Sequence, residues 1–320
     1  MTNIVAITLN PSIDISTSVD RLMPIRKLRC AAPRVYPGGG GVNVARVAVR
    51  FGADVELIYP TGGATGQLLR RLVDREGIPN LAIDLKEETR EDFTVLEETT
   101  GAEFRFVMPG PQFAEDEWQK CLEALIALQA KPDFIVGSGS LPPGVPNDFY
   151  ARVARHAANS GARFVVDTSG DALAAALQEG VFLVKPNLRE LNEMLRVEAE
   201  DDASMLAAGR QMIRDHHAEV VALSLGDLGA LLVTGDRAWR AHAPQINIVS
   251  GVGAGDSFLG ALLWAMCASL PMPEALRYAV AAGAAAVLTP GTALCERDEV
   301  EHLLPHVRVE QVHERAGAWS

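Results

Sequence analysis

The second half of the chain alternates short apolar runs with longer amphipathic stretches, and this alternation limits the possible folds most. Apolar runs rich in β-branched residues occupy residues 134–136, 163–167, 181–185 and 220–224, and each is followed or preceded by a stretch long enough for a helix. Runs of this kind are typical of buried strands. Strands and helices in regular succession predict an α/β fold, with a mainly parallel central sheet and helices on both faces.

Two segments interrupt this alternation. Residues 12–37 and 81–107 show short polar and apolar repeats, and the second resembles a hairpin around Thr99-Thr100-Gly101. We expect these inserts to form a small β-sheet lid on a single domain spanning residues 1–320, with residues 310–320 as a loose tail. Because exposed lid strands readily pair with other strands, a homodimer formed through the lid is expected.

The charge balance excludes several classes of partner. Lys and Arg number 29 against 41 Asp and Glu, which gives a net charge of −12. This argues against a nucleic-acid-binding or anionic membrane surface. The N-terminus lacks the pattern of a signal peptide, no apolar stretch is convincing as a membrane span, and the four cysteines are far apart. We therefore expect a cytoplasmic protein with reduced thiols.

A glycine-rich stretch at residues 250–257 carries the clearest chemical signal. Three glycines are followed at once by Asp256 and then by apolar residues at helical spacing. The first N–H groups of a helix lack internal partners and attract anions, and glycine lets an anion approach them. Two interpretations remain open from this stretch alone. Asp256 is either an ordinary helix cap or a general base beside an anion-binding turn.

A second glycine run, at residues 38–41, precedes Asn43 and another helical pattern. Ordering four glycines costs about 2–4 kcal/mol relative to alanine, so an ordered loop here is expected to bring bare backbone close to a ligand. A flexible hinge is the alternative. Asn43 can both donate and accept hydrogen bonds, which suits the recognition of hydroxyl groups.

Several polar residues directly follow predicted strands and should meet at one rim of the sheet, where open α/β folds bind ligands. These are Asp14, Ser140, Asp167, Lys185 with Asn187, and Ser224 with Gly226. Asn187 and Glu190 lie in the first turn of a predicted helix, where they could cap it or orient water on Mg²⁺. Lys27, Arg90 and Arg105 lie in the lid inserts, where solvated surface cations are the default interpretation.

The motifs Gly38-Gly39-Gly40-Gly41-Val42-Asn43-Val44-Ala45-Arg46 and Gly253-Ala254-Gly255-Asp256-Ser257-Phe258 together resemble the two signatures of the ribokinase-like, or PfkB-type, sugar kinases. The resemblance covers nearly the whole chain. Within the family, Thr8 to Asp14, Arg105 to Gly110 and Gly139 to Gly144 look most like the minor bacterial 6-phosphofructokinase branch.

The resemblance implies a role for each matching residue. Asp256 would be the general base, and the transferred phosphoryl group would be stabilised by the N–H groups of Gly253, Ala254 and Gly255. The residues expected to hold sugar hydroxyls are Asp14, Gly39, Gly40 and Asn43. Those expected to bind the phosphate already on the substrate are Lys27, Arg90, Arg105 and Ser140. The residues expected to line the ATP site are Lys185, Asn187, Ser224, Gly226 and Gly229. Glu190 would act through Mg²⁺-bound water, and a K⁺ ion would be held by Ser250, Val252, Ala286 and Gly291.

The implied activity is ATP-dependent phosphorylation of fructose 6-phosphate to fructose 1,6-bisphosphate, a reaction of glycolysis. Tagatose-6-phosphate kinase and fructose-1-phosphate kinase are the close alternatives. A dinucleotide-binding oxidoreductase is a distant one, because neither glycine run forms a G-x-G-x-x-G after the first strand. A sugar-phosphate sensor without catalysis is a third, against which the intact Asp256 motif argues.

Overall fold

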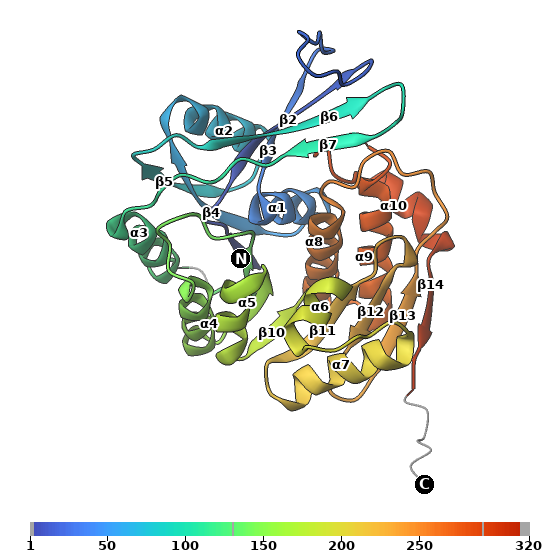
Figure 1. The fold of residues 1–320 in the computed structure, drawn as a ribbon. Coiled ribbons are helices and arrows are strands. Elements are labelled where there is room, and N and C mark those ends of the chain that lie inside the picture. Colours follow the sequence, from blue (N-terminus) through green and yellow to red (C-terminus); the bar gives the residue numbers. More distant parts are fainter. Residues whose placement is uncertain (1–2, 130, 290, 314–320) are drawn as a thin grey trace.

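A large twisted sheet between two layers of helices forms the body of the protein (Figure 1). The structure is a computed structural model and describes residues 3–129, 131–289 and 291–313. The large sheet has ten strands, which in spatial order are β14 (Arg308–Gln311), β13 (Ala238–His242), β12 (Ala230–Val233), β11 (Ala218–Ser224), β10 (Val181–Val184), β9 (Arg163–Asp167), β8 (Phe134–Ser138), β1 (Ile4–Ile7), β4 (Val55–Gly62) and β5 (Asn80–Leu85). The strands from β11 to β5 run parallel, which confirms the predicted fold class.

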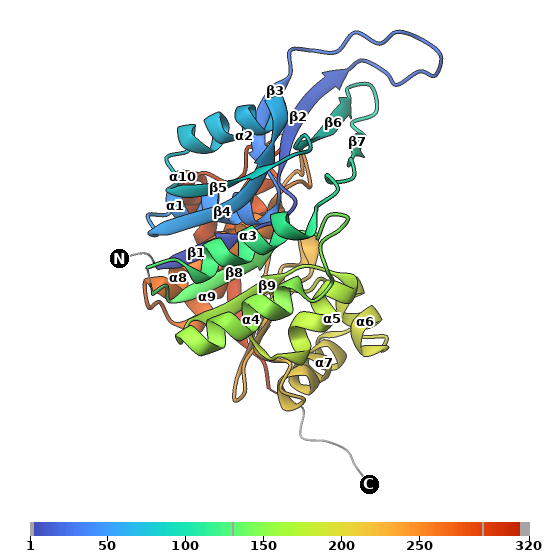
Figure 2. The same ribbon diagram turned by 90° about the vertical axis from the view of Figure 1, so that its left-hand side faces the viewer.

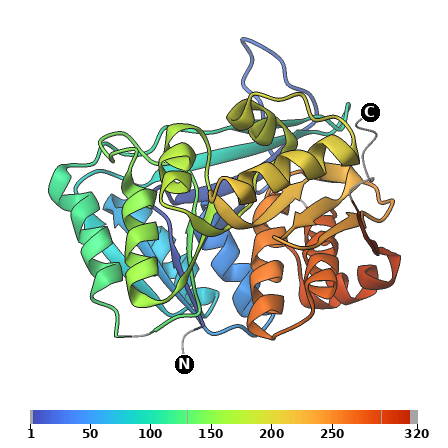
Figure 3. The same ribbon diagram turned by 90° about the horizontal axis from the view of Figure 1, so that it is seen from below.

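Helices cover both faces of this sheet. One layer contains α1 (Gly40–Arg50), α2 (Gly63–Arg75), α8 (Ala254–Cys267), α9 (Met272–Ala286) and α10 (Arg297–Leu303). The other contains α3 (Glu115–Ile126), α4 (Phe149–Ser160), α5 (Gly170–Gln178), α6 (Leu188–Leu195) and α7 (Asp202–Arg214). Figures 2 and 3 show the molecule from the side and from below, and in Figure 3 the green helices α3 and α4 lie far from the orange and red helices α8 to α10.

The two hydrophobic cores follow from the side-chain alternation of a strand. In β1, Ile4 and Ala6 belong to the core under α1 and α8, whereas Val5 and Ile7 belong to the core under the opposite helix layer. Successive residues of a strand point to opposite faces of its sheet, so a strand buried on both faces is apolar throughout. This is why the central strands read as continuous apolar runs in the sequence.

A four-stranded sheet stands over one end of the large sheet (Figure 1). Its strands, in spatial order, are β3 (Arg34–Gly38), β2 (Ser12–Val19), β6 (Arg90–Glu97) and β7 (Glu103–Phe106). The central pair, β2 and β6, runs parallel, while the outer pairs are antiparallel. The chain enters this sheet for the second time only at Arg90, because residues 80–85 form the edge strand of the large sheet instead.

The C-terminal part adds three antiparallel strands beyond β11. After β11 come the short 3₁₀ helix η1 (Gly226–Leu228) and β12, and β13 and β14 continue the sheet. A second 3₁₀ helix, η2 (Leu304–His306), precedes β14. Residues 310 and 311, predicted to belong to a loose tail, lie in β14 instead, and residues 314–320 lie outside the described residues. Within the described residues, no helix is both long and apolar enough to cross a membrane.

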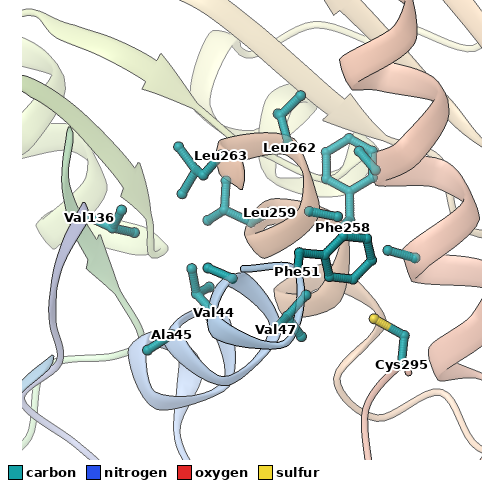
Figure 4. Packing of buried hydrophobic residues seen from close by; sticks show 14 of the residues in the cluster. Val44, Ala45, Val47, Phe51, Val136, Phe258, Leu259, Leu262, Leu263 and Cys295 are labelled. Carbon is teal, nitrogen blue, oxygen red and sulfur yellow. The ribbon is translucent and has the colours of Figure 1, made fainter. Parts of the chain in front are cut away.

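Close packing of α1 against α8 brings the two predicted glycine motifs together. Val44 and Val47 of α1 belong to the same hydrophobic core as Leu259 and Leu263 of α8 and lie beside them (Figure 4). The helices approach closely at Gly260, where an added Cβ would lie 2.8 Å from the Cβ of Val47. Interiors are packed as densely as organic crystals, so this glycine fixes the distance between the helices. Both helices consequently begin at the same rim of the sheet.

Candidate active site

Helix α8 begins with a backbone conformation that requires glycine. Gly253, the residue before the helix, has φ +76° and supplies no capping side chain. A Cβ at this position would lie 2.4 Å from Cδ2 of Leu294. Gly255, two residues after Gly253, lies against Lys185, whose Nζ would be 3.3 Å from a Cβ added to this glycine. The bare first turn leaves its N–H groups accessible, which is the geometry that favours anions at a helix N-terminus.

The Asp256 carboxylate lies in this first turn and is held from α1. Its Oδ2 accepts a hydrogen bond of 2.9 Å from Nδ2 of Asn43. Burial is the main cause that raises the pKa of Asp256 to about 6, and the nearby carboxylates of Asp167 and Asp14 contribute to this rise. The Asn43 hydrogen bond and the Lys185 ammonium oppose this rise. A carboxyl group with this pKa is mostly ionised at neutral pH and can still accept a proton effectively.

The first of two cavities, here called the lid cavity, lies between the small sheet and the starts of α1 and α8. Its volume is about 170 Å³. Eight residues predicted for substrate binding or catalysis line it, namely Asp14, Gly39, Gly40, Asn43, Arg90, Arg105, Gly253 and Asp256. These residues are far apart in the sequence, and they meet where the small sheet lies over the starts of α1 and α8.

The Asp14 side chain points into the lid cavity from β2. Its Oδ1 accepts a hydrogen bond of 2.6 Å from the hydroxyl of Ser12. Burial raises the pKa of Asp14, the Ser12 hydrogen bond opposes the rise, and Asp92 adds to it from the neighbouring position of β6. Gly38 on β3 makes room for the carboxylate, because a Cβ there would lie 2.2 Å from the Asp14 Cγ.

The second cavity, here called the hairpin cavity, has a volume of about 610 Å³. On one side it is lined by Ser224, Gly226 and Gly229, which were predicted for the ATP site. Gly229 has φ +101°, and a Cβ there would lie 2.1 Å from the carbonyl oxygen of Ala241, so glycine is required. Its other walls are formed by residues 243–246 and 248 and by Val280, Gly283 and Ala284 of α9, none of which was predicted for the ATP site.

The two cavities meet at the first turn of α8. Val252, Gly253 and Asp256 line the lid cavity, whereas Gly251, Ala254 and Gly255 line the hairpin cavity. Ligands bound in the two cavities would therefore lie on either side of the turn that holds Asp256. This geometry suits the transfer of a charged group from one ligand to the other.

Lys185 and Asp167 form a buried ion pair beside α8. Lys185 follows β10 and Asp167 is the last residue of β9, and Nζ of Lys185 lies 3.2 Å from Oδ1 of Asp167. Burial acts to lower the pKa of Lys185, but the carboxylates of Asp167 and Asp256 outweigh it and leave the pKa raised. Burial raises the pKa of Asp167, with Lys185 opposing. The sequence placed Asp167 at the sheet rim without assigning it a role.

Arg90 is tied into the wall of the lid cavity. Its Nη1 lies 2.8 Å from Oδ2 of Asp92, and its guanidinium donates to the carbonyl oxygens of Asn10 and Met108, each at 3.1 Å. Ser140 lines an adjoining cavity of about 420 Å³, which shares Arg90 with the lid cavity. Its hydroxyl accepts a hydrogen bond of 3.0 Å from the Asn10 side chain. Arg90 therefore contacts both spaces.

Lys27 lies apart from these cavities. It is exposed in the loop between β2 and β3, which projects beyond the small sheet (Figure 2). It lines none of the cavities described above. A role for Lys27 at the substrate would require the loop to move or a second copy to place it there.

Asn187 and Glu190 cap α6. Oδ1 of Asn187 accepts from the backbone N–H of Glu190, and the backbone N–H of Asn187 donates to Oε2 of Glu190, both at 2.9 Å. This reciprocal pair is a capping box. Among the described residues, no group of three His, Cys, Asp or Glu side chains could hold a metal ion.

The residues predicted for K⁺ lie around the approach to α8. The backbone N–H of Val252 donates to the Ser250 hydroxyl at 3.2 Å. The carbonyl oxygen of Ala286 already accepts from the backbone N–H and hydroxyl of Thr289, at 3.3 and 3.0 Å. Gly291 adopts φ +62°. A cation would have to compete with Thr289 for the Ala286 oxygen.

A mostly parallel α/β sheet with two cavities beside one helix start, and a general-base candidate at that start, suits a phosphotransferase. Sequence comparison places the chain among such enzymes. The model of the pfkB family of carbohydrate kinases matches residues 1–299, and the chain belongs to this family.

Individual relatives agree with this family. The ATP-dependent 6-phosphofructokinase isozyme 2 of Mycobacterium tuberculosis is 44% identical over 298 residues, which cover 93% of this chain and 88% of that protein. The 1-phosphofructokinase of Bacillus subtilis is 32% identical over 306 residues, covering 96% and 99%. The crystal structure of Escherichia coli phosphofructokinase-2 in complex with fructose-6-phosphate matches with a TM-score of 0.89 and 37% identity, covering 95% of this chain and 99% of that one.

Proposed function

We propose that this protein transfers the γ-phosphoryl group of ATP to a hydroxyl of a ketohexose phosphate, with fructose 6-phosphate as the preferred acceptor and fructose 1,6-bisphosphate as the product. The observation that carries this proposal is the first turn of α8, which both cavities share. The acceptor would bind in the lid cavity and ATP in the hairpin cavity. Their reacting ends would then meet beside Asp256.

In this reaction the Asp256 carboxylate takes the proton from the attacking hydroxyl. The hydroxyl oxygen bonds to the γ-phosphorus while the bond from that phosphorus to the bridging oxygen of ADP breaks. The N–H groups of Gly253, Ala254 and Gly255 neutralise negative charge on the transferred group. A pKa of about 6 keeps Asp256 ionised at neutral pH, so it is ready to accept a proton.

The lid cavity offers suitable contacts for a sugar phosphate. Sugar hydroxyls would bind to Asp14, Asn43 and the bare backbone of Gly39 and Gly40. The phosphate already on the sugar would bind to Arg90, Arg105 and Ser140, with Lys27 joining only through a movement of its loop or a second copy. The position of Arg90 in both the lid cavity and the adjoining cavity of Ser140 supports this assignment.

The hairpin cavity suits ATP in size and lining. Its volume of about 610 Å³ lies within the range of about 300–1,000 Å³ that is typical of small-molecule sites. Ser224, Gly226 and Gly229 would contact the nucleoside, and the apolar walls would cover the base. Lys185 and Asn187 would face the phosphates, since Lys185 lies against Gly255 at the first turn of α8.

The residues present fit a Mg²⁺ ion that is held mainly by ATP phosphates and water. The described residues offer no metal cage, and one Glu190 oxygen is engaged in the α6 cap. Mg²⁺ keeps several waters in such sites, so Glu190 would orient one of them. When bound, the ion would neutralise charge on the phosphates.

We further propose that K⁺ activates the enzyme. The crystal structure of Escherichia coli phosphofructokinase-2 in complex with potassium supports testing it. The K⁺ ion would be bound by oxygens of Ser250, Val252, Ala286 and Gly291. Thr289 would have to give up its hydrogen bond to the carbonyl oxygen of Ala286.

A homodimer through the small sheet completes the proposal. The small sheet and its loops expose Ile25, Phe104, Phe106 and Val107, with 105%, 40%, 46% and 61% of their surface accessible. Exposed apolar side chains on an edge strand favour pairing with another copy. The structure of an inhibited form of Escherichia coli phosphofructokinase-2 is tetrameric. The substrates are small metabolites, which is consistent with a cytoplasmic enzyme.

The competing acceptors differ little in shape. Relatives named 1-phosphofructokinase and tagatose-6-phosphate kinase are 32% and 30% identical to this chain, which keeps fructose 1-phosphate and tagatose 6-phosphate as alternatives. An assay of ADP release across these three sugar phosphates, ribose and adenosine, with and without K⁺, tests the proposal. The highest kcat/KM is expected for fructose 6-phosphate. A preference for an unphosphorylated acceptor would overturn the substrate assignment.

A further inference from the structure

The guanidinium of Arg46 is fully buried beneath the lid cavity, although no role has been assigned to it. Its side chain has 0% of its surface exposed. Nη2 lies 2.6 Å from Oε1 of Glu76, and Nε donates to the same oxygen at 2.8 Å. Burying an ion pair gains little stability over apolar residues of the same size. The pair is therefore better explained by what its remaining donors hold.

The third nitrogen of this guanidinium fixes the Asn43 side chain. Nη1 of Arg46 donates to Oδ1 of Asn43, one helical turn earlier in α1, at 3.3 Å. A guanidinium carries donors and no acceptor, so the amide can present only its oxygen to Arg46. The amide NH₂ group must then face the other way, where it donates to Asp256 at 2.9 Å.

The same Nη1 also holds two segments of the lid cavity wall. It donates to the carbonyl oxygen of Pro37 at 3.1 Å and to that of Thr292 at 3.0 Å. Pro37 belongs to β3 in the small sheet, and Thr292 lines the lid cavity. One buried cation thus connects the small sheet, the loop after α9 and the amide that contacts Asp256.

We infer that Arg46 is a positioning residue that orients the Asn43 amide toward Asp256 and thereby keeps this general base in its reactive carboxylate form. The catalytic part of this inference rests on the proposed function. Without Arg46 the amide is free to turn, and Asp256 loses a donor that favours its charged state. Asp167 and Asp14 raise the pKa of Asp256, whereas Asn43 and Lys185 lower it. Without the Asn43 hydrogen bond, Lys185 is left to oppose the two carboxylates.

Arg50 provides a matched control. It lies four residues further along α1 and pairs with Glu76 at 3.1 Å. It also donates to the carbonyl oxygens of Ala293 and Cys295, at 2.8 and 3.2 Å. Arg50 therefore resembles Arg46 in its ion pair and in its hold on the loop after α9, but it makes no hydrogen bond to Asn43. Because Arg50 keeps Glu76 paired, Arg46→Met does not leave this carboxylate without a cation.

The experiment compares Arg46→Met, Arg46→Lys and Arg50→Met in two ways. The first readout is the pKa of Asp256, followed by NMR of protein labelled with ¹³C at the aspartate carboxyl carbon and assigned with Asp256→Asn. The second is the pH profile of kcat/KM for fructose 6-phosphate. The sugar phosphate titrates equally in every profile, so a difference between variants belongs to the enzyme.

We expect both Arg46 variants to raise the Asp256 pKa, by about one unit in Arg46→Met, which is the size of one lost hydrogen bond to a charged group. Turnover should then fall about threefold at pH 6.5 and recover near pH 8.5. A lysine ammonium, drawn to Glu76, cannot also serve all the acceptors of a guanidinium, so Arg46→Lys should shift in the same direction. Arg50→Met should leave the pKa in place.

An unchanged Asp256 pKa in folded Arg46→Met or Arg46→Lys would overturn the inference, as would an equal shift in Arg50→Met. If Arg46→Met does not fold, Arg46→Lys decides by the same measure. The NMR readout needs no turnover. The two failures can be told apart. If the variants show the predicted pKa shifts but the wild-type protein transfers no phosphoryl group, the proposed function is wrong and the positioning role of Arg46 stands.

Discussion

Replacing Lys185 with methionine should expose how strongly the buried charges of the site depend on one another. The Lys185 and Asp167 side chains are only 8% and 17% exposed, and their charged atoms are 3.2 Å apart. Methionine has a similar length and no charge. The substitution therefore leaves the Asp167 carboxylate buried without a cation.

The expected effect is large and depends on pH. Removing one partner of a buried pair costs about 3–5 kcal/mol, which is a substantial part of the 5–15 kcal/mol that typically holds a protein folded. Burial already raises the pKa of Asp167 above its unfolded value, and loss of Lys185 raises it further. A group with a raised folded pKa destabilises the fold above that pKa and much less below it, where the folded state is protonated. The loss should be full at pH 8 and smaller at pH 5.

Urea unfolding at these two pH values measures the loss, and Lys120→Met serves as the control. Lys120 pairs with Asp116 at 2.7 Å, but both side chains are more than half exposed, so their pair should contribute little to stability. A loss in Lys185→Met that is no larger than in Lys120→Met, or that is equal at pH 5 and pH 8, would refute this reasoning.

Three further predictions address the cavities and the base. Arg90→Ala should raise the KM for fructose 6-phosphate about 10- to 100-fold with little change for ATP, as measured by initial rates with each substrate varied in turn; equal changes would contradict a phosphate-binding role. Gly229→Ala should raise the KM for ATP and lower stability by about 1–3 kcal/mol, because a Cβ at φ +101° meets the carbonyl of Ala241; an unchanged KM and urea midpoint would count against it. The kcat/KM profile should fall below pH about 6, since Asp256 must lose its proton to act, and a profile flat down to pH 5 would exclude Asp256 as the base.

Much of the fold could be predicted from the sequence because burial on both faces leaves continuous apolar strands. The run around Ile4 and the run at residues 134–136 both show this, and they lie side by side in the sheet. The strands β12 to β14 were harder to predict. They pair antiparallel at an edge of the sheet, and β14 contains only Arg308–Gln311, which has no apolar run.

The meeting of Asn43 with Asp256 could be predicted only in outline. The glycines of each motif predict the start of a helix. Connections from strand to helix place such starts at one rim of the sheet. The direct hydrogen bond between two residues 213 positions apart depends on how closely α1 and α8 pack, which Gly260 sets. A single glycine in an apolar helix does not reveal its partner.

The roles of charged residues that act through other residues could not be predicted, even for Arg46, which belongs to a quoted motif. Arg46 follows apolar residues at a helical position where an arginine is usually solvated, and its burial depends on Glu76 at the end of another helix. Asp92 lies in a strand with mixed polarity, yet it is aligned with Asp14 and pairs with Arg90. Such pairs form only after the chain has folded, so periodicity alone does not predict them.

The most direct test of the account is the turnover of Asp256→Asn with ATP and fructose 6-phosphate at pH 8, measured as fructose 1,6-bisphosphate formed. Asparagine keeps the size of the side chain and cannot accept the proton. Both substrates should still bind, and kcat should fall by about 10²- to 10⁴-fold. Undiminished turnover would contradict the claim that Asp256, at the turn shared by the two cavities, is the general base of phosphoryl transfer.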